Sequence, residues 1–242
     1  MSSADPALRP GLQGRSARLI HVKALTPTPN LVDQVRDAVL GEIAAGRLAA
    51  GARIVQEPLA RQLGVSRQPV QQALVLLRNL GVLREAPGRG LEVAPLDPVQ
   101  VGQMYDLRGA IEALAARRAA ECNPSRAARL GPALIEAGRR AVATGSVSRL
   151  AAADLRFHEF VYELSGNPHI GASMATHWVM TQRVMGEVLL HRDEAPSEIW
   201  DQHDAILQAI AAGEADRAEA LARAHTARAA GLMVARLQGE QL

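Results

Sequence analysis

The sequence is poor in aromatic residues and holds a single cysteine, and each scarcity excludes a class of protein. Phe, Trp and Tyr make up 2% of its 242 residues, which argues against a single-strand nucleic-acid binder, because such proteins stack bases on aromatic rings. Cys122 is the only cysteine, so an intramolecular disulfide is excluded. This composition is consistent with a reducing compartment. No apolar run reaches the roughly 20 residues of a membrane span, and the first residues lack the apolar core of a signal peptide. We therefore expect a cytoplasmic protein with no membrane contact.

Lysine is also nearly absent, since Lys23 is the one lysine among 27 basic residues. The basic charge is concentrated early in the chain: residues 1–96 hold 12 basic and 7 acidic residues, whereas residues 97–242 hold 15 and 18. Random scatter of charge is one explanation. A polyanionic partner for the first part alone is the other, and it is the one that the rest of the sequence favours.

Glycine and proline divide the chain into segments of different character. Residues 1–29 are rich in Ser, Pro, Gly and Arg, and we expect a flexible arm. In residues 30–96 the apolar spacing and the turn residues predict three short helices followed by a hairpin of two short strands. The helices are expected at 31–46, at 58–63 and, with Ser66 as its N-cap, at 67–80, and the strands are expected at 82–85 and 91–94.

No strand pattern is found in residues 97–242, where apolar residues recur at helical spacing. We predict six amphipathic helices that pack as an antiparallel bundle. They are expected at 98–122, 124–143, 146–165, 168–192, 196–212 and 214–238. The predicted fold class is therefore mainly α.

Residues 59–74, LARQLGVSRQPVQQAL, have the pattern of a helix-turn-helix. Gly64 supplies the turn, and the first turn of the second helix is offered to the major groove of DNA. Together with the hairpin as a wing, this predicts a winged helix-turn-helix DNA-binding domain over residues 30–96. An ordinary helical hairpin is the alternative. The candidate DNA-contacting residues are Arg36, Ser66, Arg67, Gln68, Pro69, Gln71, Arg89 and Gly90.

This stretch resembles the GntR family of bacterial regulators, whose pattern continues with L-x-x-x-G, an aliphatic residue and then P-G-x-G. The chain continues with LRNLGV and PGRG, and the resemblance covers about residues 31–96. Family members usually carry arginine where this chain has Gln71. Because Gln pairs best with adenine and Arg with guanine, the resemblance implies operator DNA but not the usual operator bases. Arg67 keeps the residue type of the family.

Four residues of metal-ligating types in the predicted bundle fall on inward stripes of three helices. Asp154 and His158 lie four residues apart on one helix, and His203 and His225 lie on two others. A carboxylate and three imidazoles suit Zn²⁺ or a similar divalent ion. The alternative is that each histidine makes only local hydrogen bonds at the edge of the core.

Residues 98–238 resemble the FCD ligand-binding domain of FadR-type GntR regulators. The similar segments are Tyr105-Asp106-Leu107-Arg108 with Glu112, Asp154-Leu155-Arg156-Phe157-His158, Gly166-Asn167-Pro168, and His203 to Ile210 with Ala224-His225. Metal-binding members use an Asp and three His at these places, so the resemblance implies a divalent metal at Asp154, His158, His203 and His225. Zinc is expected first, with nickel or manganese as alternatives, and six helices are typical of the VanR-like subgroup.

The resemblance also implies an effector-binding and dimerisation role for residues 97–242. An octahedral ion with four protein ligands would leave two positions for a small carboxylate. Arg108 is the expected carboxylate partner, with a surface ion pair to Glu112 as the alternative. His177 and Arg183 are further candidates for contact with the effector.

The predicted function is a homodimeric regulator, in the family's common mode a repressor, that binds double-stranded operator DNA and releases it on binding the carboxylate. A metal-dependent hydrolase or lyase that uses the Asp/His cluster is the alternative from another class. A four-ligand site is more closed than most catalytic zinc sites. A DNA-binding architectural protein without a ligand is a third reading.

Overall fold

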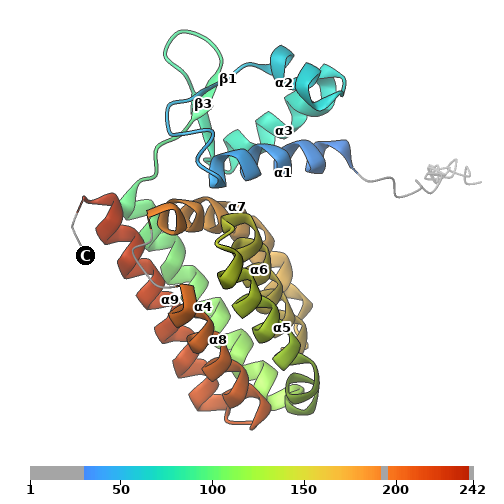
Figure 1. Ribbon diagram of the computed structural model, residues 1–242, viewed down its shortest axis with the longest axis vertical. Helices are drawn as coiled ribbons and strands as arrows, with labels where there is room; N and C mark the ends of the chain where they lie inside the picture. Colours follow the sequence, from blue (N-terminus) through green and yellow to red (C-terminus); the bar gives the residue numbers. More distant parts are fainter. Residues whose placement is uncertain (1–29, 192–195, 240–242) are drawn as a thin grey trace, which may run out of the picture.

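The computed structural model describes residues 30–191 and 196–239, without the side chains at 176, 185–191 and 196. The predicted arm, residues 1–29, lies outside the described residues. Two bodies of different size are joined by a short linker before residue 98, with the small one stacked on one end of a helical bundle (Figure 1).

The small body contains three helices and a three-stranded sheet. Asn30 caps the first helix by accepting a hydrogen bond from the Val32 amide at 3.0 Å. Ser66 occupies the equivalent position before the third helix, but its side chain makes no capping bond, contrary to expectation. The elements are α1 (Leu31–Ala44), β1 (Arg53–Ile54), α2 (Gln56–Leu63), α3 (Arg67–Asn79), β2 (Leu83–Glu85) and β3 (Leu91–Val93).

The sheet has the antiparallel order β1-β3-β2. Strands β2 and β3 form the predicted hairpin, with Leu83 opposite Val93. Strand β1 was not predicted, because two residues are too few to show an alternating pattern. The core of this body includes Val35, Val70 and Leu77, which come from α1 and α3.

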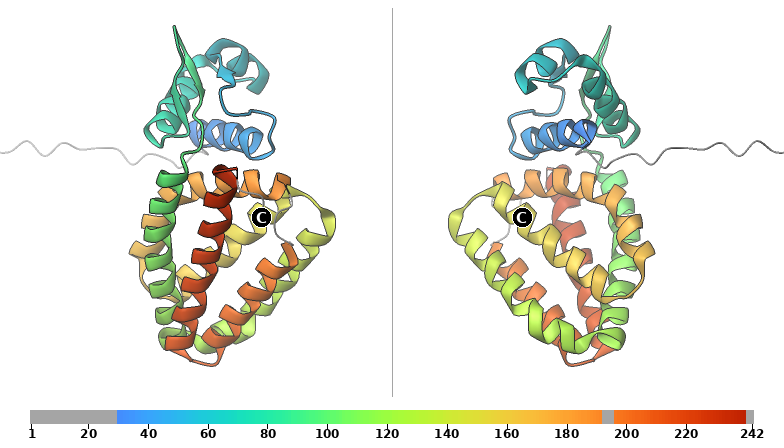
Figure 2. Two further views of the ribbon diagram at one scale, coloured as in Figure 1. Left: turned by 90° about the vertical axis from the view of Figure 1, so that its left-hand side faces the viewer. Right: turned by 90° about the vertical axis from the view of Figure 1, so that its right-hand side faces the viewer.

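The large body consists of six helices, close to the predicted ranges. These are α4 (Pro98–Cys122), α5 (Pro124–Thr144), α6 (Val147–Leu164), α7 (Pro168–His191), α8 (Pro196–Ala211) and α9 (Ala215–Leu237). Helices α4 and α9 lie side by side along most of their length, and α5 packs between α6 and α8 (Figure 2). Helix α7 crosses the end of the bundle directly beneath α1.

Two glycines on α5 allow α8 to approach closely. A Cβ at Gly131 would overlap the Leu207 side chain, and one at Gly138 would overlap the Trp200 ring. Trp200 is 2% exposed and is part of the bundle core. The close contact of α5 and α8 therefore depends on residues without a side chain. None of the helices within the described ranges combines the length and apolar composition of a membrane span.

Candidate metal centre and DNA-binding surface

The bundle interior brings together all four of the metal-ligand candidates. Asp154 and His158 come from α6, His203 from α8 and His225 from α9, and all four are buried. The Nε2 atom of His203 lies 3.2 Å from Nε2 of His225 and 3.5 Å from Oδ1 of Asp154. Nε2 of His158 lies 3.8 Å from Oδ2 of Asp154. One nitrogen from each histidine lies within 4.8 Å of the others, so these residues have the donor atoms and the spacing to surround one ion.

Two of the imidazoles are held from behind by a polar side chain. Nδ1 of His158 lies 3.2 Å from Oε2 of Glu112, and Nδ1 of His225 lies 2.8 Å from Oε1 of Gln202. Such partners fix the ring orientation and leave the other nitrogen free to ligate. Nδ1 of His203 has no hydrogen-bond partner among the described residues, and its ring is held instead by stacking on Phe157 with centroids 4.2 Å apart.

Burial keeps His203 and His225 neutral. It lowers the pKa of His225 to about 3, with help from the charge of His158, and it lowers the pKa of His203 well below the usual range. A neutral imidazole has the lone pair that a metal requires. Burial also raises the pKa of Asp154, because its carboxylate is removed from water.

Arg108 lies at the edge of this cluster. Its Nε donates to Oε1 of Glu112 at 2.7 Å, and its Nη2 lies 3.3 Å from Nε2 of His158. The side chains of Arg108 and Glu112 are 3% and 4% exposed, so the alternative of a surface ion pair was wrong: the pair forms, but inside the bundle. Burial alone would raise the pKa of Glu112, yet the charges of Arg108 and His158 lower it overall. Tyr162 also donates to the Glu112 carboxylate, at 2.8 Å.

The small body presents most of the candidate DNA-contacting residues on its surface. Ser66, Arg67, Gln68 and Gln71 are exposed at the start of α3, and Arg89 and Gly90 are exposed in the hairpin turn. The turn is held by a 2.7 Å hydrogen bond from Arg53 to the Pro87 carbonyl. This arrangement offers the first turn of α3 and the wing tip to one partner.

Three of the candidate DNA-contacting residues are buried or already paired with a neighbouring side chain. Pro69 is buried against the core, because the first turn of α3 directs it inward, so it shapes the helix start instead of offering a side chain to DNA. Arg36 is held by Asp33 at 2.7 Å and by Asp37 at 2.8 Å. Arg67 pairs with Glu57 at 2.9 Å, although both side chains are well exposed.

Comparisons with known proteins match both bodies. Residues 31–93 match the profile described as "Bacterial regulatory proteins, gntR family", and residues 103–228 match the profile of the FCD domain. The chain belongs to the GntR family. It is 32% identical, over 85% of its length and 89% of the relative, to a "Probable D-xylose utilization operon transcriptional repressor" of Paenarthrobacter nicotinovorans. It is 28% identical, over 62% of its length and 68% of the relative, to the regulator McbR of Escherichia coli K12.

Solved structures show the same fold. E. coli McbR/YncC superposes with a TM-score of 0.70 at 23% identity, over 88% of this chain and 99% of that one. A putative GntR regulator from Rhodococcus sp. RHA1 gives 0.67 at 20% identity, over 87% and 99%. The relatives and both family profiles are those of transcription regulators, so this GntR protein is a DNA-binding regulator of the FadR type and not an enzyme.

In this GntR regulator, His177 and Arg183 lie at the junction of the two bodies. Both line a cleft of about 320 Å³ between the end of α3, the linker and the start of α4. Arg183 also donates to the backbone carbonyl of Ala94 in the linker. The cause is the position of α7, whose inward residues face the histidine cluster while these two face the small body. This location differs from the effector pocket that the sequence predicted for them.

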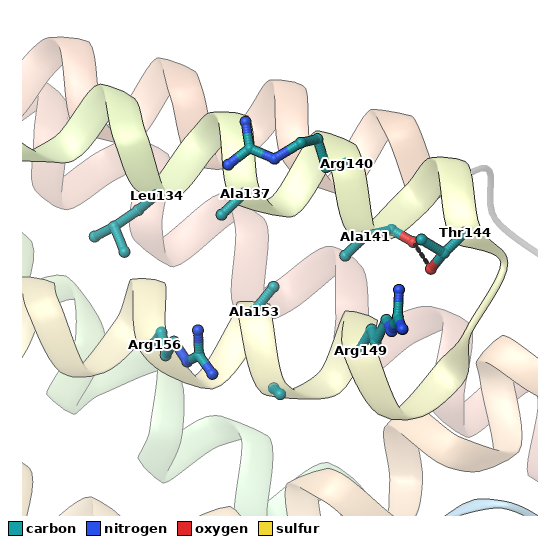
Figure 3. Close-up of a pocket in the computed structure, with 9 residues that line it drawn as sticks. Leu134, Ala137, Arg140, Ala141, Thr144, Arg149, Ala153 and Arg156 are labelled. Carbon is teal, nitrogen blue, oxygen red and sulfur yellow. Dashed lines mark hydrogen bonds between the residues drawn. The ribbon is translucent and has the colours of Figure 1, made fainter.

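A second hollow, of about 450 Å³, lies between α5 and α6 on the outside of the bundle (Figure 3). Its floor is formed by alanines, and Arg149 and Arg156 extend from α6 toward α5. It contains none of the predicted site residues, so the buried cluster remains the candidate effector site.

Sequence reasoning missed the residues that orient the ligands. Gln202 was not singled out, although it directly precedes His203, because an amide has no distinctive spacing. Glu112 was noticed only as a partner for Arg108, whereas it also holds His158, which lies 46 residues away in sequence on another helix. No sequence signal indicated that contact.

Proposed function

We propose that this GntR regulator is a homodimeric repressor whose operator affinity is controlled by a small carboxylate, bound together with a divalent metal ion in the helical body. The observation that carries the proposal is that three buried imidazoles each place a nitrogen within 4.8 Å of the others, and that those of His158 and His203 also lie within 3.8 Å of an Asp154 oxygen. An apolar core would be less costly than this set of buried polar groups, so a bound metal or ligand gives a reason for their presence.

The donor set favours zinc, with nickel or manganese as alternatives. Asp154, His158, His203 and His225 would hold the ion, and Glu112 and Gln202 would keep two of the rings in the ligating orientation. When bound, the ion would supply a positive charge that attracts an anionic effector. Imidazole suits zinc, copper, iron and nickel, so the donors alone do not single out one element.

Arg108 is the proposed partner of the effector carboxylate. Its guanidinium is buried, keeps one edge on Glu112 and directs Nη2 toward the cluster. A guanidinium binds a carboxylate through two parallel hydrogen bonds. A metal at Nε2 of His158 would compete with the present contact of Nη2 and would release this donor for the effector.

Helix α7 is the proposed connection between the effector and the DNA. On its inner face, Trp178 lies against His158 with ring centroids 5.2 Å apart. On its outer face it packs under α1, and Arg183 holds the linker at Ala94. A ligand that prefers one position of α7 therefore prefers one placement of the small body, and this difference in affinity is the coupling free energy.

Repression is supported by the P. nicotinovorans relative, which is named a "Probable D-xylose utilization operon transcriptional repressor". A dimer would place two α3 helices in successive major grooves of a near-palindromic site. The test is a gel-shift titration with the DNA upstream of the gene, before and after removal of metal with a chelator and with added carboxylates. Salt-sensitive binding that weakens with a carboxylate only in the metal-loaded protein supports the proposal. Operator binding that changes neither on removal of the metal nor on addition of carboxylates would overturn the proposal.

A further inference from the structure

Two buried hydrogen-bond donors on α7 have no acceptor within the described part of the chain. The indole Nε1 of Trp178 and the hydroxyl of Thr181 are both orphaned, in side chains that are 6% and 0% exposed. A buried donor without an acceptor is destabilising, and native proteins contain few such groups. Two of them one helical turn apart therefore require an explanation.

Both donors lie beside the candidate effector site. The centroid of the Trp178 ring lies 5.0 Å from the guanidinium carbon of Arg108. Thr181 lies one turn further along α7, and Val184, one turn beyond it, packs in a cluster with Tyr105 of α4. Thr181 therefore lies between Trp178 and Val184 on the helix. The side chains of those two residues face α4 near Arg108 and Tyr105.

Other buried hydroxyls in the bundle are satisfied. Thr226 donates to the Ala222 carbonyl at 3.1 Å, one turn back along its own helix, and Tyr162 donates to Glu112 at 2.8 Å. A helical threonine ordinarily bonds to such a carbonyl, but Thr181 does not. Its hydroxyl is therefore available to a group outside its own helix.

We infer that Trp178 and Thr181 form a second contact site for the effector and that the effector is a hydroxylated carboxylate. The inference rests on the proposed function, in which Arg108 takes the carboxylate end. The indole N–H can only donate, so it needs an oxygen acceptor. A threonine hydroxyl both donates and accepts, which suits a ligand hydroxyl. A plain aliphatic or aromatic acid would leave both donors unsatisfied.

Matched acids test the ligand class. Two pairs differ chiefly in hydroxyl groups: D-gluconate with hexanoate, and 4-hydroxybutyrate with butyrate. Calorimetric titration into the full-length metal-loaded protein is expected to show at least one hydroxylated acid binding about tenfold or more tightly than its partner, and releasing operator DNA at lower concentration. A site built around polar groups rejects the analogue that lacks them.

Variants test the two residues. Thr181→Val keeps the shape of the side chain, Trp178→Phe keeps an aromatic ring, and each removes the donor, so each is expected to abolish most of the difference between the paired acids. Thr226→Val, which removes a satisfied hydroxyl, is the matched control and should keep the difference. In the ligand-free protein, Thr181→Val should leave the melting temperature unchanged or raise it, whereas Thr226→Val should lower it.

The outcomes separate this inference from the proposed function. Equal binding of both acids in each pair, an undiminished preference in both variants, or a lowered melting temperature in Thr181→Val would overturn the inference alone. Metal-dependent release of the operator by all four acids would leave the proposed function standing. Release by none of them would overturn the inference.

Discussion

The Nε2 atoms of His203 and His225 lie 3.2 Å apart, although the residues are on different helices. Burial lowers the pKa of both groups, so two neutral rings face each other. Nδ1 of His225 lies beside the carbonyl oxygen of Gln202, which can only accept, so the His225 proton is on Nδ1 and its Nε2 carries a lone pair. His203 must then donate through Nε2, which leaves its own Nδ1 unpaired, as found. A cation between the two rings would allow His203 to place its proton on Nδ1 and ligate through Nε2.

The contact of Gln202 with His225 predicts an effect on metal affinity. Gln202→Ala removes the acceptor that fixes the ring, and such partners are typically worth about 10–100-fold in affinity. The measurement is competition for the metal by a chromophoric chelator. Gln208→Ala, which removes an exposed amide from the same helix, should have no effect. Equal affinity in the two variants would show that Gln202 does not orient the ring.

The recognition helix predicts a change in operator sequence. Gln71 is exposed on α3, and Gln71→Arg is expected to shift base preference by ~1–3 kcal/mol at one position in each half-site, because Arg favours guanine. Selection from random DNA measures the preference. Gln62→Arg adds the same charge on exposed α2 and should strengthen binding to all sequences alike. An unchanged selected site in Gln71→Arg would show that this residue does not read a base.

Substitution of two glycines by alanine is expected to change the stability in opposite directions, because only one of them lies where α5 closely approaches α8. Gly138→Ala forces a methyl group into the buried Trp200 ring and should lower the free energy of unfolding by ~1–3 kcal/mol. Because Trp200 lies edge-on to His203, with centroids 4.9 Å apart, metal affinity should also fall. Gly171→Ala on α7 meets open space and should stabilise by about 0.5–1 kcal/mol. Urea unfolding measures both, and equal stability of the two variants would contradict the packing described.

Acid should destabilise the metal-free protein before carboxylates become protonated. The pKa of His225 is about 3 in the folded protein and 6.5 as its ordinary value, so between these limits the unfolded chain binds a proton that the folded chain does not. The stability that neutral His225 contributes is complete above pH 6.5 and is lost as the pH falls toward 3. The raised pKa of Asp154 opposes this loss in part.

Unfolding free energies measured by circular dichroism at pH 7, 6 and 5 test the histidine effect. His225→Gln should flatten the dependence, whereas His169→Gln, at an exposed position, should leave it unchanged. The same slope in His225→Gln as in the wild type would assign the acid sensitivity to other groups.

The sequence was sufficient for the fold because its signals were local. Helical spacing and turn residues placed the helix ends within about two residues, and only β1 was missed. The four metal-ligand candidates were also found, since their inward stripes follow from helical period. What local patterns could not show is which helices meet. The contact of Glu112 with His158, the burial of Arg108 and the place of Arg183 on the linker all depend on the packing of α4, α6 and α7.

The central claim is that Asp154, His158, His203 and His225 form a metal centre that governs operator affinity. The most direct test is the metal content of the purified protein by mass spectrometry, wild type beside His203→Ala, with operator affinity measured on the same samples. We predict about one divalent ion per chain in the wild type, its loss in the variant, and an operator affinity in the variant that no longer responds to carboxylates. A wild-type protein that binds operator DNA without a metal, or a variant that keeps its ion, would contradict the claim.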